Sequence, residues 1–173
     1  MPNYRRLYLS SQSVFITIAT YHRKRIFIDP QNIEILFDTI NRVKIIHPFE
    51  MLACVVMPEH LHCIIQTPDD TPNYSPVIHS IKRNFALNYK KLHHIDLPVK
   101  LWQARFWDHV IKDDDDFEKH LDYIHWNPVI HGFVDDPIKW QWSTFSKWYE
   151  DGFYNEAWGK GEMPENIQKM DFE

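Results

Sequence analysis

The chain has 173 residues, enough for one domain with a sizeable buried core. Its 44% hydrophobic and 15% aromatic content excludes a disordered protein, and its 4 glycines argue against phosphate-binding glycine loops. No run of about 18 apolar residues occurs, and the first residues lack the apolar stretch of a signal peptide. We therefore expect a cytoplasmic protein with no membrane partner.

The net charge of −5 conceals a strong asymmetry along the chain. Residues 1–107 carry a net charge of +5, whereas residues 108–173 carry −10. Affinity for a phosphate backbone depends on a local basic surface rather than on the overall sign of the charge. A nucleic-acid partner is therefore permitted by the composition but not required by it.

The first half of the chain predicts a strand, a helix and a hairpin. Residues 13–20 are rich in β-branched side chains, which is typical of a strand. A helix should begin at Asp29-Pro30 and end near His47-Pro48, because the residue before a proline avoids helical backbone angles.

An apolar run at 49–57 then predicts a central strand, and Pro58-Glu59 a turn. Residues 60–67 form its antiparallel partner. Cys54 and Cys63 flank this turn and are expected to be buried reduced thiols that lie across from each other.

The second half predicts two helices with a strand between them. The first helix should start at Ser75-Pro76 and run to about His94, and a strand should cover 104–111. The acidic run 113–116 is interpreted as the solvated start of a helix, with a metal site as the alternative. That helix should run over 117–127, ended by Pro128.

This β-α-β-β-α-β order is that of a ferredoxin-like α+β fold with an additional C-terminal helix. Such a fold is a four-stranded antiparallel sheet with its helices on one face, and its first and third strands are central. We assign residues 1–158 to a single domain and residues 159–173 to a polar C-terminal tail.

Two short segments carry residues suited to chemistry. In a strand, His60 and His62 point to the same face, and in a helix Tyr123 and Asn127 lie one turn apart on the same side. Each residue also has an ordinary structural interpretation. The histidines could be hydrogen-bonded in the core, the ring of Tyr123 could pack on the sheet, and Asn127 could cap the end of the helix. Together, two imidazoles, an amide oxygen and a phenol would form a site with one divalent ion and one nucleophile. Mn²⁺ suits these ligands better than Mg²⁺.

Three ordered motifs make the chain resemble a known family. The stretch Val56-Met57-Pro58-Glu59-His60-Leu61-His62 is similar to the histidine motif of the single-tyrosine HUH transposases of the insertion-sequence 200/605 type. The stretches 102–109 (WQARFWDH) and 122–129 (DYIHWNPV) narrow the resemblance to the REP-associated tyrosine transposases. Tyr4-Arg5-Arg6 and Trp142-Ser143-Thr144-Phe145 are also similar to that branch, so the resemblance covers residues 3–158.

The resemblance implies a nuclease that cuts single-stranded DNA beside REP-like palindromic hairpins. It implies that Tyr123 is the nucleophile and forms a 5′-phosphotyrosyl link. It also implies that His60, His62 and Asn127 hold a divalent metal, Mg²⁺ or Mn²⁺. His120 and His125 are either proton relays or bystanders.

Basic and aromatic side chains are candidates for DNA contact. The basic set is Arg5, Arg6, Lys82, Arg83, Lys90, Lys91 and Arg105. Trp102 and Trp107 are candidates for stacking on unpaired bases. The four basic residues at 82–91 share one predicted helix, and the alternative is that they form an ordinary solvated face.

Two other functions remain open. The chain could be a hairpin-binding module that does not cleave, or a metal hydrolase that activates water and uses Tyr123 only for packing. The oligomeric state is open between monomer and homodimer. The nuclease hypothesis requires that the two imidazoles face the same side of their sheet and that the hydroxyl of Tyr123 is not buried in the interior.

Overall fold

The computed structural model describes residues 13–70 and 73–170, so Arg5 and Arg6 lie outside the described part of the chain. One antiparallel sheet has the strand order β2-β3-β1-β4. Its strands are β1 (Ser13–Ala19), β2 (Glu50–Val56), β3 (His60–Gln66) and β4 (Trp107–Val110). The central strands are therefore the first and the third, as the ferredoxin-like prediction required.

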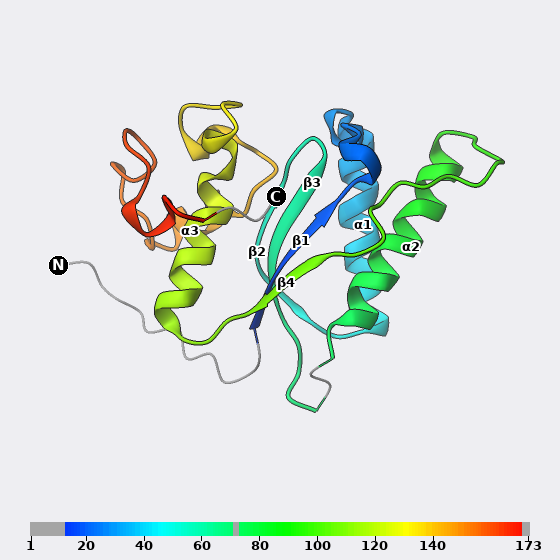
Figure 1. Ribbon diagram of the computed structural model, residues 1–173, viewed down its shortest axis with the longest axis horizontal. Coiled ribbons are helices and arrows are strands. Elements are labelled where there is room, and N and C mark those ends of the chain that lie inside the picture. Colours follow the sequence, from blue (N-terminus) through cyan, green and yellow to red (C-terminus); the bar gives the residue numbers. More distant parts are fainter. Residues whose placement is uncertain (1–12, 71–72, 171–173) are drawn as a thin grey trace.

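Two long helices, α1 (Pro30–Ile46) and α2 (Ser75–Leu92), cover one face of the sheet (Figure 1). Every second side chain of β3 points to this face, so Leu61, Cys63 and Ile65 lie in its apolar core. Within residues 13–70 and 73–170, no helix has the length and apolar character needed to cross a bilayer.

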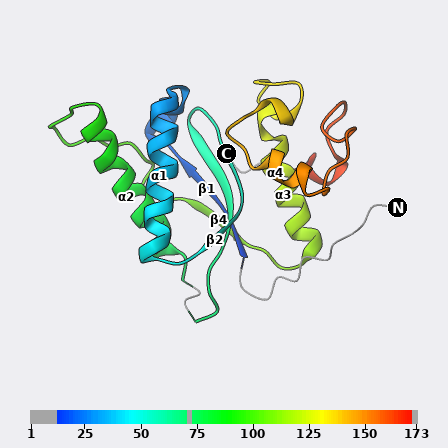
Figure 2. The ribbon, with the colours of Figure 1, turned by 180° about the vertical axis from the view of Figure 1, so that it is seen from behind.

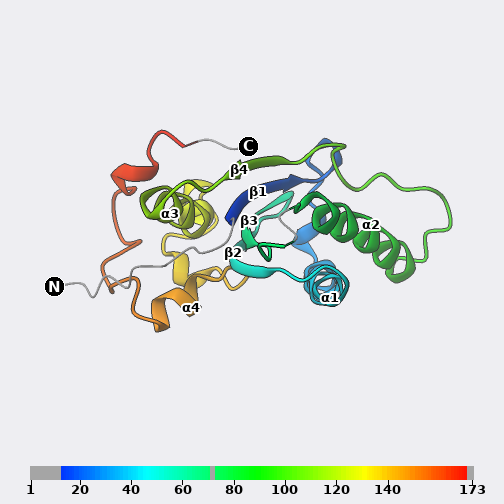
Figure 3. The same ribbon diagram turned by 90° about the horizontal axis from the view of Figure 1, so that it is seen from below.

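The opposite face is covered by α3 (Asp114–Ile130), which places the sheet between two layers of helix (Figure 3). Phe15 and Ile64 point to this side and pack with Leu121 and Ile124 of α3 in a second apolar core. The short helix α4 (Phe145–Glu150) lies beside α3 (Figure 2). The additional C-terminal helix is thus a layer of its own, and the residues of β3 that face it form the floor of any site between them.

The prediction that Pro128 ends this last helix was wrong. α3 continues through Pro128 to Ile130, and the N–H of His131 donates to the carbonyl of Asn127 at 3.1 Å. A proline removes one helical N–H and disturbs the preceding turn, but within the last turn two further residues can keep helical backbone angles.

The last strand is shorter than the predicted 104–111. The Lys82 ammonium donates to the carbonyls of Gln103 and Ala104, at 2.7 and 3.1 Å. These carbonyls are engaged by a helix side chain, and regular strand pairing begins only at Trp107.

The hairpin cysteines are buried, free and opposite each other in the β2–β3 register, as predicted. Burial raises the pKa of the Cys54 thiol to about 12. Cys54 therefore acts as a small apolar side chain at neutral pH rather than as a reactive thiolate.

Residues 159–170 pack against the rest of the protein, although their composition indicated a polar tail. Ile167 is buried in the core around α3, and Asn166 donates to the carboxylate of Asp122 at 2.7 Å. A polar segment can thus be attached to the domain by a few apolar side chains, provided that each is buried against another element.

Candidate active site

The paired histidines lie on the face of β3 that α3 covers. The ring centroids of His60 and His62 are 4.7 Å apart, and both side chains are fully buried. The two rings therefore share one side of the sheet, as the strand spacing predicted.

Protein neighbours contact the Nδ1 atom of each ring. Thr17, the residue opposite His62 in the β1–β3 register, places its Oγ1 2.8 Å from His62 Nδ1. His60 Nδ1 lies 3.2 Å from a carboxylate oxygen of Glu59 and 3.4 Å from Arg23. The hydrogen bond with His60 is the main reason why the pKa of Glu59 is lowered. Such contacts fix the orientation of each ring and leave Nε2 as the nitrogen that would bind a metal.

Tyr123 of α3 lies directly against the paired histidines. Its ring centroid is 5.3 Å from that of His62 and 6.1 Å from that of Phe15. Only 2% of Tyr123 is exposed, which differs from the accessible phenol that a nuclease requires. The requirement of an accessible phenol is therefore not met in this arrangement, and attack on DNA requires that the residues covering Tyr123 first move aside.

Asn127 follows one turn after Tyr123 and is completely buried. Neither its Oδ1 nor its Nδ2 has a hydrogen-bond partner within the described residues. Burying an amide in this way costs about 1–3 kcal/mol. A side chain kept at such a cost fits the role of a metal ligand, whose oxygen the cation would engage. On this observation, His60, His62 and Asn127 suit a divalent metal.

Sequence reasoning missed His131, which lies at the same site. Its ring centroid is 5.6 Å from that of His60. Tyr123, Asn127 and His131 follow one another at intervals of four residues, which places them on one side of a helix. This signal was present in the sequence, but the prediction that the helix ends at Pro128 hid it.

Two other residues of the 122–129 motif belong to a buried polar network. His125 contacts Tyr154 Oη at 2.8 Å and Thr144 Oγ1 at 2.9 Å, and burial lowers its pKa to about 3. Asp122 accepts hydrogen bonds from Tyr154 and Asn166, at 3.0 and 2.7 Å. These residues tie the C-terminal segment to α3, and the position of His125 within this network fits the bystander alternative.

The basic residues proposed for DNA contact have different surroundings. Arg83, Lys91 and Arg105 are exposed, and half-buried Lys90 donates to the carbonyl of Asp96 at 3.2 Å. Lys82, by contrast, is buried against the carbonyls described above. DNA contact by this set stays a prediction.

The two tryptophans also differ. Trp102 is buried, packs on Phe27 and Phe85, and donates its indole N–H to the carbonyl of Lys82 at 3.1 Å. Trp107 on the edge strand β4 is 41% exposed. Only Trp107 is placed where an unpaired base could stack on it without disturbing the core.

The sheet places the His-x-His pair of β3 against the ring of Tyr123 on α3, which is the arrangement expected from the resemblance to the single-tyrosine transposases. The family model for "Transposase IS200 like" matches residues 8–127, and the chain belongs to this family.

Curated relatives cover nearly the whole chain. The "REP-associated tyrosine transposase" of Escherichia coli (strain K12) is 36% identical over 158 residues, which are 91% of this chain and 91% of that protein. The "Putative REP-associated tyrosine transposase" of Haemophilus influenzae (strain ATCC 51907 / DSM 11121 / KW20 / Rd) is 32% identical and covers 92% of this chain and 94% of its own.

Two solved structures are also similar. The first is described as a REP-associated tyrosine transposase bound to a REP hairpin. It has 32% identity and a TM-score of 0.76, and covers 99% of both chains. A putative transposase from Deinococcus radiodurans has a TM-score of 0.52 at 18% identity, covers 69% of this chain and 92% of its own, and supports the fold alone.

Proposed function

We propose that this transposase nicks and rejoins single-stranded DNA beside REP-like palindromic hairpins through a 5′-phosphotyrosine on Tyr123. The observation that carries the proposal is the contact between the ring of Tyr123 and the paired histidines, with a buried amide one helical turn away. The hairpin substrate is supported by the relative whose structure is described as bound to a REP hairpin.

In the proposed reaction, the phenolic oxygen of Tyr123 attacks the scissile phosphorus. A phosphorus–tyrosine bond forms, the bond from phosphorus to the leaving 3′-oxygen breaks, and that oxygen takes up a proton. The 5′-phosphate stays on the protein, and the reverse attack by a 3′-hydroxyl joins strands without an external energy source. Tyrosine has an ordinary pKa near 10, so its ionisation at neutral pH costs roughly 4 kcal/mol.

A bound divalent cation would polarise the phosphate and favour the phenolate. His60, His62 and Asn127 would hold it. Thr17 and Glu59 would keep the two imidazoles in the orientation that presents Nε2. Mg²⁺ and Mn²⁺ both fit these functions.

Incubation of the full chain with a labelled single-stranded hairpin oligonucleotide and Mn²⁺ tests the proposal. We expect a covalent protein–DNA adduct on a denaturing gel, with the label on Tyr123 by peptide mass spectrometry. Tyr123→Phe should abolish the adduct and still bind the hairpin. Tyr149→Phe, on α4 and outside the site, is the matched control and should react normally.

Other outcomes would favour the alternatives. Tight hairpin binding by the unaltered chain with Mn²⁺ but without an adduct would favour a binding module that does not cleave. Full cleavage by Tyr123→Phe would favour a hydrolase that activates water. His60→Ala and His62→Ala should lose cleavage and keep hairpin binding, and an equal loss of both properties would count against metal ligation.

A further inference from the structure

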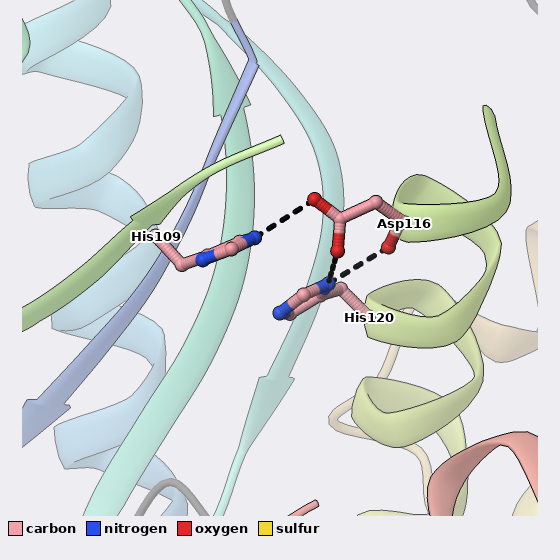
Figure 4. A group of neighbouring side chains, drawn as sticks. All are labelled: His109, Asp116 and His120. Atoms are coloured by element: carbon pink, nitrogen blue, oxygen red, sulfur yellow. Dashed lines mark hydrogen bonds and ion pairs between the residues drawn. The ribbon is translucent and has the colours of Figure 1, made fainter. Parts of the chain in front are cut away.

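A second group of metal-binding side chains lies where β4 meets the start of α3 (Figure 4). His109 projects from β4 toward α3, and Asp116 and His120 lie one turn apart on α3. Asp116 Oδ2 is 2.8 Å from His109 Nε2, and Asp116 Oδ1 is 3.2 Å from His120 Nδ1. One ligand atom from each residue lies within 4.8 Å of the other two.

The acidic run at the start of α3 thus contains two kinds of residue. Asp113 caps the helix by accepting from the N–H of Asp116 at 2.8 Å, and Asp114 and Asp115 are exposed, as expected for a solvated helix start. Asp116 is different because its carboxylate faces two imidazoles. The interpretation of the run as a helix start therefore holds for its first three residues, and only the fourth is placed for ligation.

The side chains of this group also contact the backbone at the start of α3. The N–H of Lys112 donates to Asp116 Oδ2 at 3.0 Å, and His120 Nδ1 lies 2.7 Å from the backbone carbonyl of Asp116. The rings of His109 and His120 are stacked, with centroids 4.6 Å apart.

We propose that His109, Asp116 and His120 form a second metal site, which binds a Zn²⁺-type transition ion and is separate from the His60–His62 pair. Two imidazoles and one carboxylate are a common protein ligand set for Zn²⁺, with solvent in the fourth position. Zn²⁺ ligand distances of about 2.0–2.2 Å place neighbouring ligand atoms about 3.3 Å apart. The two contacts to Asp116, at 2.8 and 3.2 Å, already lie near this value. His120 Nδ1 would exchange its contact with the Asp116 carbonyl for the ion.

The position of the site suggests what the ion would do. It would join the edge strand β4 to the helix that carries Tyr123, three residues beyond His120. Phe15 packs on both His120 and His62, with centroid distances of 4.8 and 5.5 Å. An ion here would brace α3 against the sheet beside the proposed active site without entering it.

Zn²⁺ titration of the full chain, followed by calorimetry and by thermal unfolding, tests this proposal. In a His60→Ala/His62→Ala chain, which lacks the first pair, we expect one Zn²⁺ per chain and an unfolding midpoint raised by about 5 °C or more at saturation. Addition of His109→Ala should weaken this binding about tenfold or more. His47→Ala, at the end of α1, is the matched control and should leave it unchanged.

His109 is 27% exposed on an edge strand, so its replacement should leave the fold intact. His109→Gln and Asp116→Asn, measured also in the chain that keeps His60 and His62, should each lose one Zn²⁺ equivalent. Zn²⁺ binding that is unchanged by these replacements, or absent from the His60→Ala/His62→Ala chain, would overturn the second site. Neither result bears on the Tyr123 adduct, which is measured with Mn²⁺.

Discussion

Asn127 is a completely buried polar side chain whose amide has no hydrogen-bond partner within the described residues. Asn32 is similarly buried, but both ends of its amide are satisfied, by the carbonyl of Ile26 and by His93, each at 2.7 Å. The contrast supports the proposal that Asn127 is a metal ligand. Proteins often retain such destabilising groups where function needs them.

Asn127→Leu should therefore stabilise the protein in metal-free buffer by about 1 kcal/mol, because the unsatisfied amide is removed. The same variant should lose Mn²⁺-dependent cleavage. Chemical unfolding in EDTA and the hairpin assay measure the two effects. Asn32→Leu is the matched control and should be destabilised by about 1–3 kcal/mol. A loss of stability in Asn127→Leu as large as that in Asn32→Leu would show that Asn127 is structural.

The helix α2 carries basic side chains with two distinct roles. Lys82 is turned inward to the segment before β4, and burial lowers its pKa. Its neighbour Arg83 is exposed. Adjacent residues on a helix point about 100° apart, so one can bind its own protein while the other faces solvent.

We expect replacement of Lys82 to affect mainly stability and replacement of Arg83 to affect mainly DNA binding. Lys82→Met should lower the free energy of unfolding by about 1–3 kcal/mol, because two carbonyls lose their partner. Arg83→Met should change it by less than about 0.5 kcal/mol. Arg83→Met should also weaken hairpin binding and reduce its salt slope by about 1. Urea unfolding and anisotropy titrations in NaCl measure these effects, and an unchanged salt slope would remove α2 from the interface.

At the scale of the whole molecule, the C-terminal segment is attached to α3 through hydrogen bonds to Asp122. Tyr154 and Asn166 both donate to Asp122, and the carboxylate is buried among them. Burial raises the pKa of Asp122 to about 6. The folded protein therefore binds a proton at Asp122 more tightly than the unfolded chain does. The stability that this proton contributes is present below about pH 4 and is lost as the pH rises through 6.

Asp122→Asn should remove this contribution. A shift of about two pKa units corresponds to roughly 3 kcal/mol in full, of which about 2 kcal/mol falls between pH 4.5 and 7.5. The unaltered protein should thus lose about 2 kcal/mol more stability than Asp122→Asn over this interval. Urea unfolding at both pH values provides the measurement. If the stability of the two proteins depends equally on pH, Asp122 is ionised at both pH values.

Local periodicity was sufficient to predict most of the fold and part of the site. The alternation of a strand places His60 and His62 on one face, and the helical turn places Tyr123 near Asn127, because both relations depend only on backbone geometry within one element. The strand order was predicted from the β-α-β-β-α-β order of the elements, and the cysteine pair from the short turn that joins two adjacent strands.

Packing between elements decided the rest. The contact of Tyr123 with His62, its burial, and the meeting of His109 with Asp116 depend on α3 covering the face of the sheet opposite α1 and α2. The inward turn of Lys82 depends on the path of the segment that contains Gln103 and Ala104. Residues on separate elements come together only through the balance of all buried surfaces, which no local pattern encodes.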